Sequence, residues 1–323
     1  MRRIARAAAA LLAFLTLATP TAPGPGPGPG TPVAARLFAR PVALDEAAPG
    51  QRQLGPFRYV SGWVLSSDDR RFGSISSMHV ENGWVLAVGD RGTLFRFAVP
   101  SHGSSEVAIL PLRQGPGAFR SNVERDAESL AIAAGHAWVA FENSNEIWRY
   151  RLPDWAAVAR AASSPLRRWP ANRGAEAMAR LQDGRFLLIQ EDDGDDGTSQ
   201  AVLFAGDPAM PDTISLTVRY RPPKGHRITD AALLPNGRLI LLSRGFTWRG
   251  GWSAKLLTAD LPSKAGQTLQ TFEVATLAAP LTVDNMEALA VTSEGGRTIL
   301  WLASDDNLNP LQRTLLMKFE LME

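Results

Sequence analysis

Three stretches of the chain carry the same phrase: Asp126-Ala-Glu-Ser-Leu-Ala131, Gly174-Ala-Glu-Ala-Met-Ala179 and Asn285-Met-Glu-Ala-Leu-Ala290. Weaker copies are Ile228-Thr-Asp-Ala-Ala-Leu233 and Gly73-Ser-Ile-Ser-Ser-Met78. Each copy runs into a glycine-containing turn and then into a second apolar strand. Hairpins that recur about every 50 residues indicate a radial array of β-sheets, which gathers equivalent residues at one shared mouth.

The strands in these repeats predict an all-β fold, a β-propeller of five blades, with six still possible because residues 113–125 and 155–165 are poor strand candidates. Four repeats supply four strands each, but the fifth supplies only three. Its missing outer strand is available at residues 57–65, so an N-terminal strand would complete the last blade. Closing the ring in this way protects exposed strand edges. A β-sandwich or two small β domains are the alternatives, but neither explains an acidic residue that recurs at one strand position.

The N-terminus has the layout of a signal peptide. Three arginines precede an apolar run over residues 7–18, which is too short to span a bilayer as a helix. We therefore expect a periplasmic or secreted protein with no stable membrane insertion after cleavage, and a short membrane anchor is the alternative. Residues 23–30 alternate Pro and Gly, which is typical of a stiff, solvated linker. The expected domains are residues 1–22 for the signal peptide, 23–53 for the Pro/Gly-rich linker and 54–323 for the propeller.

Composition excludes several classes of function. The 34 basic and 32 acidic residues give a net charge of +2, and without Arg2, Arg3 and Arg6 the count is 31 against 32, or −1. This balance does not favour nucleic-acid binding. The absence of cysteine excludes disulfides and a thiol nucleophile, and with only four histidines a zinc site is not expected. No Gly-x-Ser-x-Gly elbow, Walker loop or dinucleotide fingerprint occurs. We expect a monomer that acts on a small molecule.

Hairpin geometry places the recurring acids on one face of the ring. In a hairpin, the start of the first strand and the end of the second lie together, opposite the turn. Ser76 and Thr229 take the strand-start position in the two blades without a glutamate, and Arg244 replaces an acid at one second-strand end. The carboxylates expected on this face are Glu128, Glu176 and Glu287 at strand starts, and Asp90, Glu142, Glu191 and Asp305 after second strands.

Carboxylates gathered at one mouth repel one another unless cations lie between them. Oxygen ligands favour a hard ion such as Ca²⁺, and arginines on the same face are the other source of positive charge. The structural alternative is that each glutamate accepts hydrogen bonds from the next blade and only holds the ring together. The run Glu191-Asp-Asp-Gly-Asp-Asp-Gly197 resembles a calcium loop in composition but lacks the EF-hand spacing.

Several motifs carry a resemblance to a known family: the three glutamate phrases, Leu86-Ala-Val-Gly-Asp-Arg-Gly92, Asp183-Gly-Arg185, Thr229-Asp230 and Ser304-Asp-Asp-Asn-Leu-Asn-Pro-Leu-Gln-Arg-Thr314. Through them the chain resembles the phytase-like family, described by the esterase-like activity of phytase, over residues 55–321. This family is similar to β-propeller phytases. The resemblance therefore implies an acid-lined channel, Ca²⁺ dependence and phosphomonoester hydrolysis.

These observations predict an exported hydrolase that cleaves ester or phosphoester bonds with the help of a metal at the propeller mouth. Ca²⁺ is expected to neutralise the substrate phosphate and to lower the pKa of an attacking water. The alternative is a non-catalytic propeller that binds a ligand or a partner in the cell envelope. The expected metal ligands are Asp90, Glu128, Glu176, Glu287 and Asp305, the three glutamates are also the candidate catalytic residues, and the expected substrate-binding residues are Arg91, Arg244 and Arg313.

Overall fold

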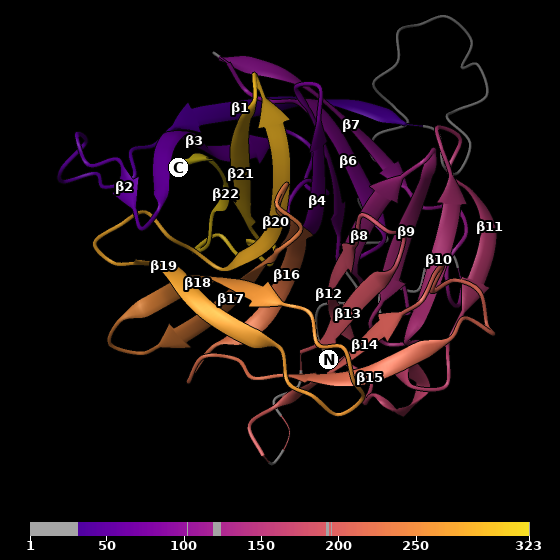
Figure 1. Ribbon diagram of the computed structural model, residues 1–323. Coiled ribbons are helices and arrows are strands. Elements are labelled where there is room, and N and C mark those ends of the chain that lie inside the picture. Colours follow the sequence, from indigo (N-terminus) through magenta and orange to yellow (C-terminus); the bar gives the residue numbers. More distant parts are fainter. Residues whose placement is uncertain (1–31, 102, 119–123, 192–193, 195, 323) are drawn as a thin grey trace, which may run out of the picture.

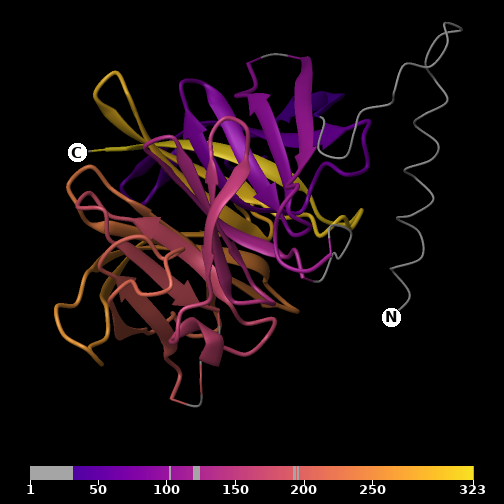
Figure 2. The same cartoon turned by 90° about the vertical axis from the view of Figure 1, so that its right-hand side faces the viewer.

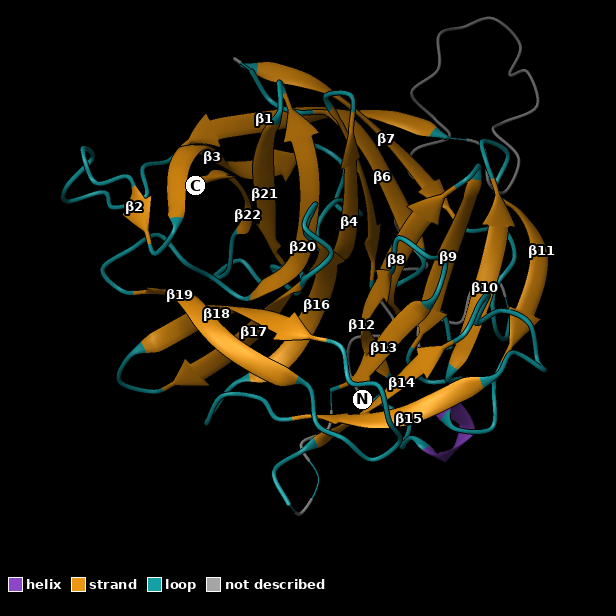
Figure 3. Ribbon diagram, in the orientation of Figure 1, coloured by secondary structure: helices purple, strands orange, loops and turns teal. Residues whose placement is uncertain are grey.

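The computed structural model describes residues 32–101, 103–118, 124–191, 194 and 196–322. The expected signal peptide and the Pro-Gly repeat lie outside these residues. Within them the chain is almost entirely strand and loop, with one 3₁₀ helix, η2 (Leu166–Arg168) (Figure 3). None of the helical structure in the described part of the chain is long and apolar enough to cross a membrane.

The strands form a β-propeller, as the repeats predicted. Antiparallel pairing forms three four-stranded sheets and one ten-stranded sheet, in which two further four-stranded groups are joined through β1. These five groups are numbered here as blades 1 to 5 (Figure 1). From the innermost strand outward, blade 1 contains β4 (Ile75–Glu81), β5 (Trp84–Gly89), β6 (Thr93–Ala98) and β7 (Ser104–Pro111); blade 2 contains β8 (Ala127–Ala133), β9 (His136–Phe141), β10 (Glu146–Arg151) and β11 (Ala156–Ala161); blade 3 contains β12 (Ala175–Arg180), β13 (Phe186–Gln190), β14 (Ser199–Phe204) and β15 (Ser215–Tyr220).

The two remaining blades follow the same order. Blade 4 contains β16 (Arg227–Leu233), β17 (Leu239–Thr247), β18 (Gly251–Asp260) and β19 (Gln270–Ala278), and blade 5 contains β20 (Met286–Glu294), β21 (Arg297–Ser304), β22 (Thr314–Leu321) and β3 (Phe57–Ser67). The first strands of the blades contact one another in cyclic order, β4 with β8, β8 with β12, β12 with β16, β16 with β20 and β20 with β4. These five strands therefore line the axis of the ring.

The N-terminal segment completes the last blade. β3 pairs antiparallel with β22 from Leu321↔Phe57 to Thr314↔Leu65. Figure 2 shows the C-terminal strand beside the N-terminal strands, which come from the opposite end of the sequence. The prediction that an N-terminal strand closes the ring is confirmed.

The expectation that residues 23–53 form a linker is wrong for the part that the structure describes. β1 (Val33–Pro41) pairs with β3 on one side and with β7 on the other, so blades 5 and 1 share one continuous sheet. Leu37 and Leu44 are fully buried, and β2 (Gln53–Leu54) pairs with the start of β3. The outer edges of β3 and β7 would otherwise be unpaired, and a strand between them satisfies both. The folded domain therefore includes residues well before Leu54.

Hydrophobic clusters fill the spaces between neighbouring blades. Each cluster contains buried residues from two neighbouring blades. Examples are Trp301 and Ile109 for blades 5 and 1, Val139 and Val88 for blades 1 and 2, Leu188 and Ala140 for blades 2 and 3, Leu241 and Ile189 for blades 3 and 4, and Leu300 and Leu242 for blades 4 and 5. Alternate strand residues point to opposite blade faces, so each blade contributes one apolar face to each neighbour. This packing leaves the ends of the inner hairpins free to carry polar groups.

Candidate acidic site at the mouth of the propeller

The repeated phrase marks a β-bulge in every blade. In each inner hairpin the register between the first and second strand shifts by one residue of the first strand. A bulge bends the strand locally and changes the direction of the extra side chain, which is why bulges often occur beside active sites. The five residues at the shift are Ser76, Glu128, Glu176, Thr229 and Glu287.

Hydrogen bonds that hold the blades together come from the residue after the bulge. Ser77 Oγ accepts a hydrogen bond from Leu130 N at 3.2 Å and donates to Asp230 Oδ2 at 3.2 Å. Asp230 Oδ2 also accepts from Leu289 N at 2.8 Å. This chain of bonds connects blades 2, 1, 4 and 5 across the ring, and both polar side chains are buried. Ser129 Oγ also donates to Ala175 O, and Thr229 Oγ1 to Met286 O, each at 3.2 Å. Interblade hydrogen bonds therefore come from these neutral and aspartate side chains rather than from the three recurring glutamates.

Blades 2 and 3 form an acidic half of the mouth, which we define as Asp126, Glu128, Glu142 and Glu176. Oxygen atoms of Asp126, Glu128 and Glu142 lie within 4.8 Å of one another, and so do those of Glu142, Glu176 and Glu191. Glu142 belongs to both groups. Among the described residues, the ion pairs include none to any member of the acidic half, whereas Glu191 does have arginine partners.

Burial and mutual repulsion raise the pKa values of this half. Burial, and then the neighbouring Glu191, raise the pKa of Glu142 to about 7. Burial, and then Asp90 and Glu142, raise the pKa of Asp126 to about 7. The pKa values of Glu128 and Glu176 are raised well above their usual range, again by burial first and neighbouring carboxylates second. Full ionisation of this half is therefore unfavourable unless a cation binds.

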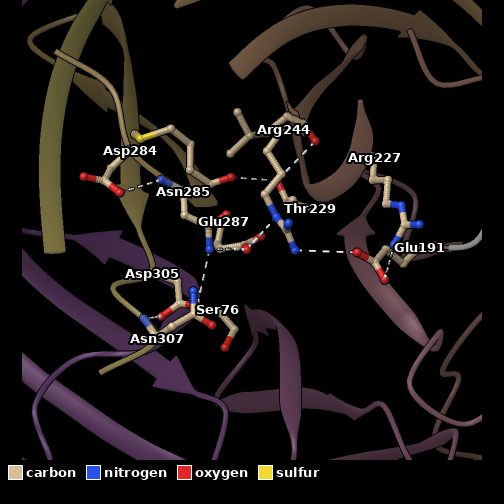
Figure 4. A network of polar contacts seen from close by, with 12 residues as sticks. Ser76, Glu191, Arg227, Thr229, Arg244, Asp284, Asn285, Glu287, Asp305 and Asn307 are labelled. Atoms are coloured by element: carbon tan, nitrogen blue, oxygen red, sulfur yellow. Dashed lines mark hydrogen bonds and ion pairs between the residues drawn. The ribbon is translucent and has the colours of Figure 1, made fainter. Parts of the chain in front are cut away.

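Blades 4 and 5 form an arginine half of the mouth, which we define as Arg244, Asn285 and Glu287. Arg244 Nε lies 2.6 Å from Glu287 Oε1, and its Nη2 lies 3.5 Å from Glu191 Oε1 (Figure 4). Asn285 Nδ2 donates to the same oxygen of Glu287 at 2.9 Å. Burial raises the pKa of Glu287 to about 7, with Arg244 opposing the rise. Glu191 lies on the border of the two halves, since Arg227 Nη1 also approaches it at 3.6 Å.

Asp90 and Asp305 lie between the two halves on the blade 5 and blade 1 side. Ser76 Oγ donates to Asp90 Oδ1 at 2.9 Å, and Asn307 N donates to Asp305 Oδ1 at 2.6 Å. Burial, and then the charges of Asp90 and Glu287, raise the pKa of Asp305 to about 9. Asp305 is therefore protonated at neutral pH in the absence of a cation. Asn285 Nδ2, at 3.4 Å from Asp305 Oδ2, connects it to the arginine half.

The three arginines expected to bind substrate differ in their surroundings. Arg244 lies in the mouth, and its side chain is 25% exposed. Arg91 is exposed beside Asp90, and its charge opposes the rise in the pKa of that carboxyl. Arg313 Nε donates to Asp284 Oδ2 at 3.0 Å and its Nη2 donates to Val283 O at 2.7 Å. Arg313 therefore braces the segment that leads into β20.

The expected set of five metal ligands is not brought around one shared ion. Glu128 and Glu176 fall in two different groups of carboxylates that Glu142 connects, and Asp90, Glu287 and Asp305 belong to neither group. Blade 4 has Thr229 rather than a carboxylate at its bulge, so it adds no ligand there. Arg244 from the same blade pairs with Glu287 and so engages that carboxylate. Asp126 was not among the expected ligands, because it occurs in only one copy of the phrase. Glu142 and Glu191 were expected on this face but not as ligands.

The donor set of the acidic half fits Ca²⁺. All ligand atoms are carboxylate oxygens, which a hard ion prefers. Ca²⁺ binds oxygen at about 2.3–2.6 Å, so oxygens that lie within 4.8 Å of one another, as in both groups, can reach one ion. Elsewhere in the mouth, Asn285 Oδ1 is buried and has no hydrogen-bond partner among the described residues, so a neutral oxygen is also available.

The fold and the site together define an acid-lined β-propeller. The family comparison agrees: the chain belongs to the phytase-like family, described as esterase-like activity of phytase, whose profile matches residues 70–308. No curated protein matches the chain.

Among solved structures, the chain is similar to glutaminyl cyclase from Myxococcus xanthus, with 12% identity over 83% of this chain and 97% of that one, at a TM-score of 0.46. It is also similar to the PQQ-bound aldose sugar dehydrogenase from Streptomyces coelicolor, with 16% identity over 80% and 98% of the two chains, at a TM-score of 0.45. A chain of the nidogen/laminin complex shows 11% identity over 84% and 88%, at a TM-score of 0.42.

Proposed function

We propose that this protein is an exported hydrolase that cleaves phosphate or carboxylic esters at the acidic half of its mouth with the help of Ca²⁺. The observation that carries the proposal is the group of buried and half-buried carboxylates on blades 2 and 3, which has no ion pair among the described residues. Several carboxylates this close together are costly when ionised, so they either stay protonated or bind a cation, and a bound cation lets them ionise at neutral pH. Membership of the phytase-like family supports the same reading.

In this proposal Asp126, Glu128 and Glu142 hold one Ca²⁺, and Glu142, Glu176 and Glu191 hold a second. Bound Ca²⁺ would supply positive charge to an anionic substrate and lower the pKa of a nearby water. Glu142 is central because it belongs to both groups. Asp305, with its raised pKa, can hold and donate a proton at Oδ2 to a leaving oxygen.

Arg244 and Arg91 are the proposed contacts for the oxygens of the substrate. Glu287 and Glu191 hold the Arg244 guanidinium through Nε and Nη2, which orients its remaining N–H groups for a bidentate contact with an anion. Glu287 is therefore a positioning residue in this proposal, although the sequence had suggested a catalytic role. Arg313 is omitted because Asp284 and Val283 already occupy its guanidinium.

The rival function is a propeller that binds a ligand or envelope partner without catalysis, with the acids serving only as staples. Its structural premise is weakened, because Ser77, Ser129, Thr229 and Asp230 form interblade hydrogen bonds. Among the described hydrogen bonds, no backbone N–H donates to Glu128, Glu176 or Glu287. The rival therefore needs a different explanation for the acidic half.

The test combines metal analysis with a substrate screen. Protein purified without chelator should contain calcium, and it should hydrolyse members of a panel of phosphate and carboxylic esters in a chelator-sensitive manner. Glu142→Gln should remove both the calcium and the chelator-sensitive activity, whereas Glu106→Gln, an exposed acid on the outermost strand β7, should preserve them. A folded protein that contains no calcium, gains no stability from it and turns over no ester would overturn the proposal in favour of the binding propeller.

Export is part of the proposal. The mature protein recovered from the periplasm or culture fluid should begin between Ala18 and Thr31, at the boundary of the apolar run and the Pro-Gly repeat. N-terminal sequencing decides this, and an intact Met1 on membrane-bound material would point to the anchor instead.

A further inference from the structure

A serine and a histidine meet on blade 4, outside the acidic half. His226 Nε2 lies 3.0 Å from Ser253 Oγ, although the two residues are 27 positions apart in the sequence. His226 immediately precedes β16, and Ser253 lies on β18. Both side chains are half-buried, so each retains contact with solvent. No sequence motif marks this pair, because one member precedes β16 and the other lies on β18, two strands that are not adjacent in the blade.

The tautomer of His226 follows from its second contact. His226 Nδ1 lies 3.1 Å from the backbone carbonyl of Lys224, which can only accept a hydrogen bond. Nδ1 must therefore carry the proton, so the neutral ring presents a lone pair at Nε2. That lone pair faces the Ser253 hydroxyl, whose single proton has two acceptors within reach, His226 Nε2 at 3.0 Å and Gly245 O at 3.3 Å. A serine hydroxyl that donates to a histidine held by a third group is the arrangement of an activated nucleophile.

A glycine holds the ring in place. Gly245 on β17 is paired directly with Ser253, so side chains at the two positions point to the same face of the blade. A Cβ at Gly245 would lie 3.1 Å from both Cγ and Cδ2 of His226 and 2.5 Å from Gly225 O. The absence of a side chain at Gly245 thus creates the space in which the imidazole lies against the strand. The histidine is positioned by the backbone of two elements.

This pair is separate from the arginine half of the mouth. Arg244 and Gly245 are consecutive on β17, so their side chains point to opposite faces of the blade. The face that carries His226 and Ser253 is the one whose residues, such as Leu241, pack toward blade 3. On the neighbouring strand β19, Glu273 accepts hydrogen bonds from Lys255 Nζ at 2.7 Å and from Thr276 Oγ1 at 2.6 Å, and these contacts lower its pKa most. The charge of His226 lowers the pKa of Glu273 further, so this carboxylate adds a negative charge near the imidazole without contacting it.

We propose that Ser253 and His226 form a second, metal-independent centre that hydrolyses small carboxylic esters. Ser253 Oγ attacks the ester carbonyl while its proton passes to His226 Nε2. The carbon–oxygen bond to the alcohol then breaks, and the alcohol leaves with the proton from His226. Water next attacks the acylated serine, giving its proton to the same nitrogen, and the carboxylic acid leaves as the serine hydroxyl is restored. Lys224 contributes only its carbonyl, which orients the ring.

The experiment uses a fluorophosphonate probe on the full-length exported protein in the presence of EDTA. The Ser253 oxygen displaces fluoride from phosphorus, and peptide mass spectrometry locates the adduct without any variant that must first fold. We expect one adduct, at Ser253. His226→Gln should lower its rate of formation by about 100-fold, the usual contribution of a general base. Hydrolysis of p-nitrophenyl acetate with EDTA present should fall in parallel in Ser253→Ala.

His136 provides the matched control. Its Nδ1 contacts Ala134 O at 3.1 Å in the same way, but no serine hydroxyl is among its described hydrogen-bond partners. His136→Gln should leave the labelling rate unchanged. No adduct at Ser253, or an adduct that forms equally fast in His226→Gln, would overturn the proposal. Chelator separates the two proposals, because EDTA abolishes the calcium-dependent activity and leaves the labelling intact.

Discussion

The glutamates at the same repeat position have different charged neighbours in the two halves of the mouth. In the acidic half, Glu128 and Glu176 share their surroundings with Asp126 and Glu142. The described ion pairs include none to these glutamates, and the charge of Arg244 only partly opposes the rise in the pKa of Glu176. In the arginine half, Glu287 lies at the same bulge but pairs with Arg244 at 2.6 Å. The difference shows that the bulge provides a direction for a side chain, whereas the neighbouring blade decides whether a carboxylate there is compensated by the protein or requires an added cation.

The largest expected effect comes from removing the internal cation of the arginine half. Arg244→Gln leaves Glu287 buried without its partner and removes one partner of Glu191. Loss of one partner of a buried ion pair costs about 3–5 kcal/mol. Because Arg244 is partly exposed, we expect the free energy of unfolding to fall by about 3 kcal/mol, the lower end of this range. Urea denaturation at pH 8 measures it. Arg227→Gln, which removes a longer and more exposed pair to the same Glu191, should cost less than about 1 kcal/mol.

The acidic half should make calcium-free protein less stable as the pH rises. The pKa of Glu142 is raised from 4.5 to about 7 in the folded state, so the folded state binds more protons between these values. Stability is therefore fully present below about pH 4.5 and decreases as the pH rises through 7. Because solvent partly screens this carboxylate, we expect the loss for Glu142 alone to be about 1 kcal/mol rather than the full value of the shift. Melting temperatures in EDTA from pH 5 to pH 8 test this, and Glu142→Gln should flatten the profile.

Calcium should restore the lost stability at pH values where the carboxylates are ionised. A ligand at about 100 times its dissociation constant stabilises the folded state by about 2.7 kcal/mol, which corresponds to a rise of roughly 5 °C in the melting temperature. We expect this rise at pH 8 and a smaller one at pH 5, because protons compete with the ion for the same oxygens. Glu287→Gln should retain the rise. Equal rises in Glu142→Gln and in the unmodified protein would place the calcium elsewhere.

The smallest effect is also the most direct comparison of the halves. In EDTA at pH 8, Glu142→Gln should increase stability by about 1 kcal/mol, because it removes one charge from a repelling group. Glu287→Gln should decrease stability by about 1–3 kcal/mol, because Arg244 loses its charged partner. The same chemical change thus has opposite signs in the two halves. Two decreases of similar size would mean that protein cations compensate the acidic half as well.

Local patterns in the sequence were sufficient for the architecture. Recurring phrases about 50 residues apart located the inner hairpins, and their shared third position proved to be the bulge in all five blades. The count of strands located the closing strand β3. Both follow from short-range rules, since alternation and turns are properties of neighbouring residues. The same rules missed β1, because a Pro-Gly run just before it suggested a linker over residues 23–53 and hid a strand whose role depends on two distant edges.

The sequence by itself determined that carboxylates would collect at one end of the ring, because hairpin geometry returns each second strand to the start of the first. Only the tertiary structure decided how they divide. In the folded protein Asp126 and Glu142 lie beside Glu128, Arg244 pairs with Glu287, and Ser77 and Asp230 hydrogen-bond across blades. These outcomes depend on contacts between blades, and a strand pattern contains no information about which side chains from different blades come within a few ångströms of one another.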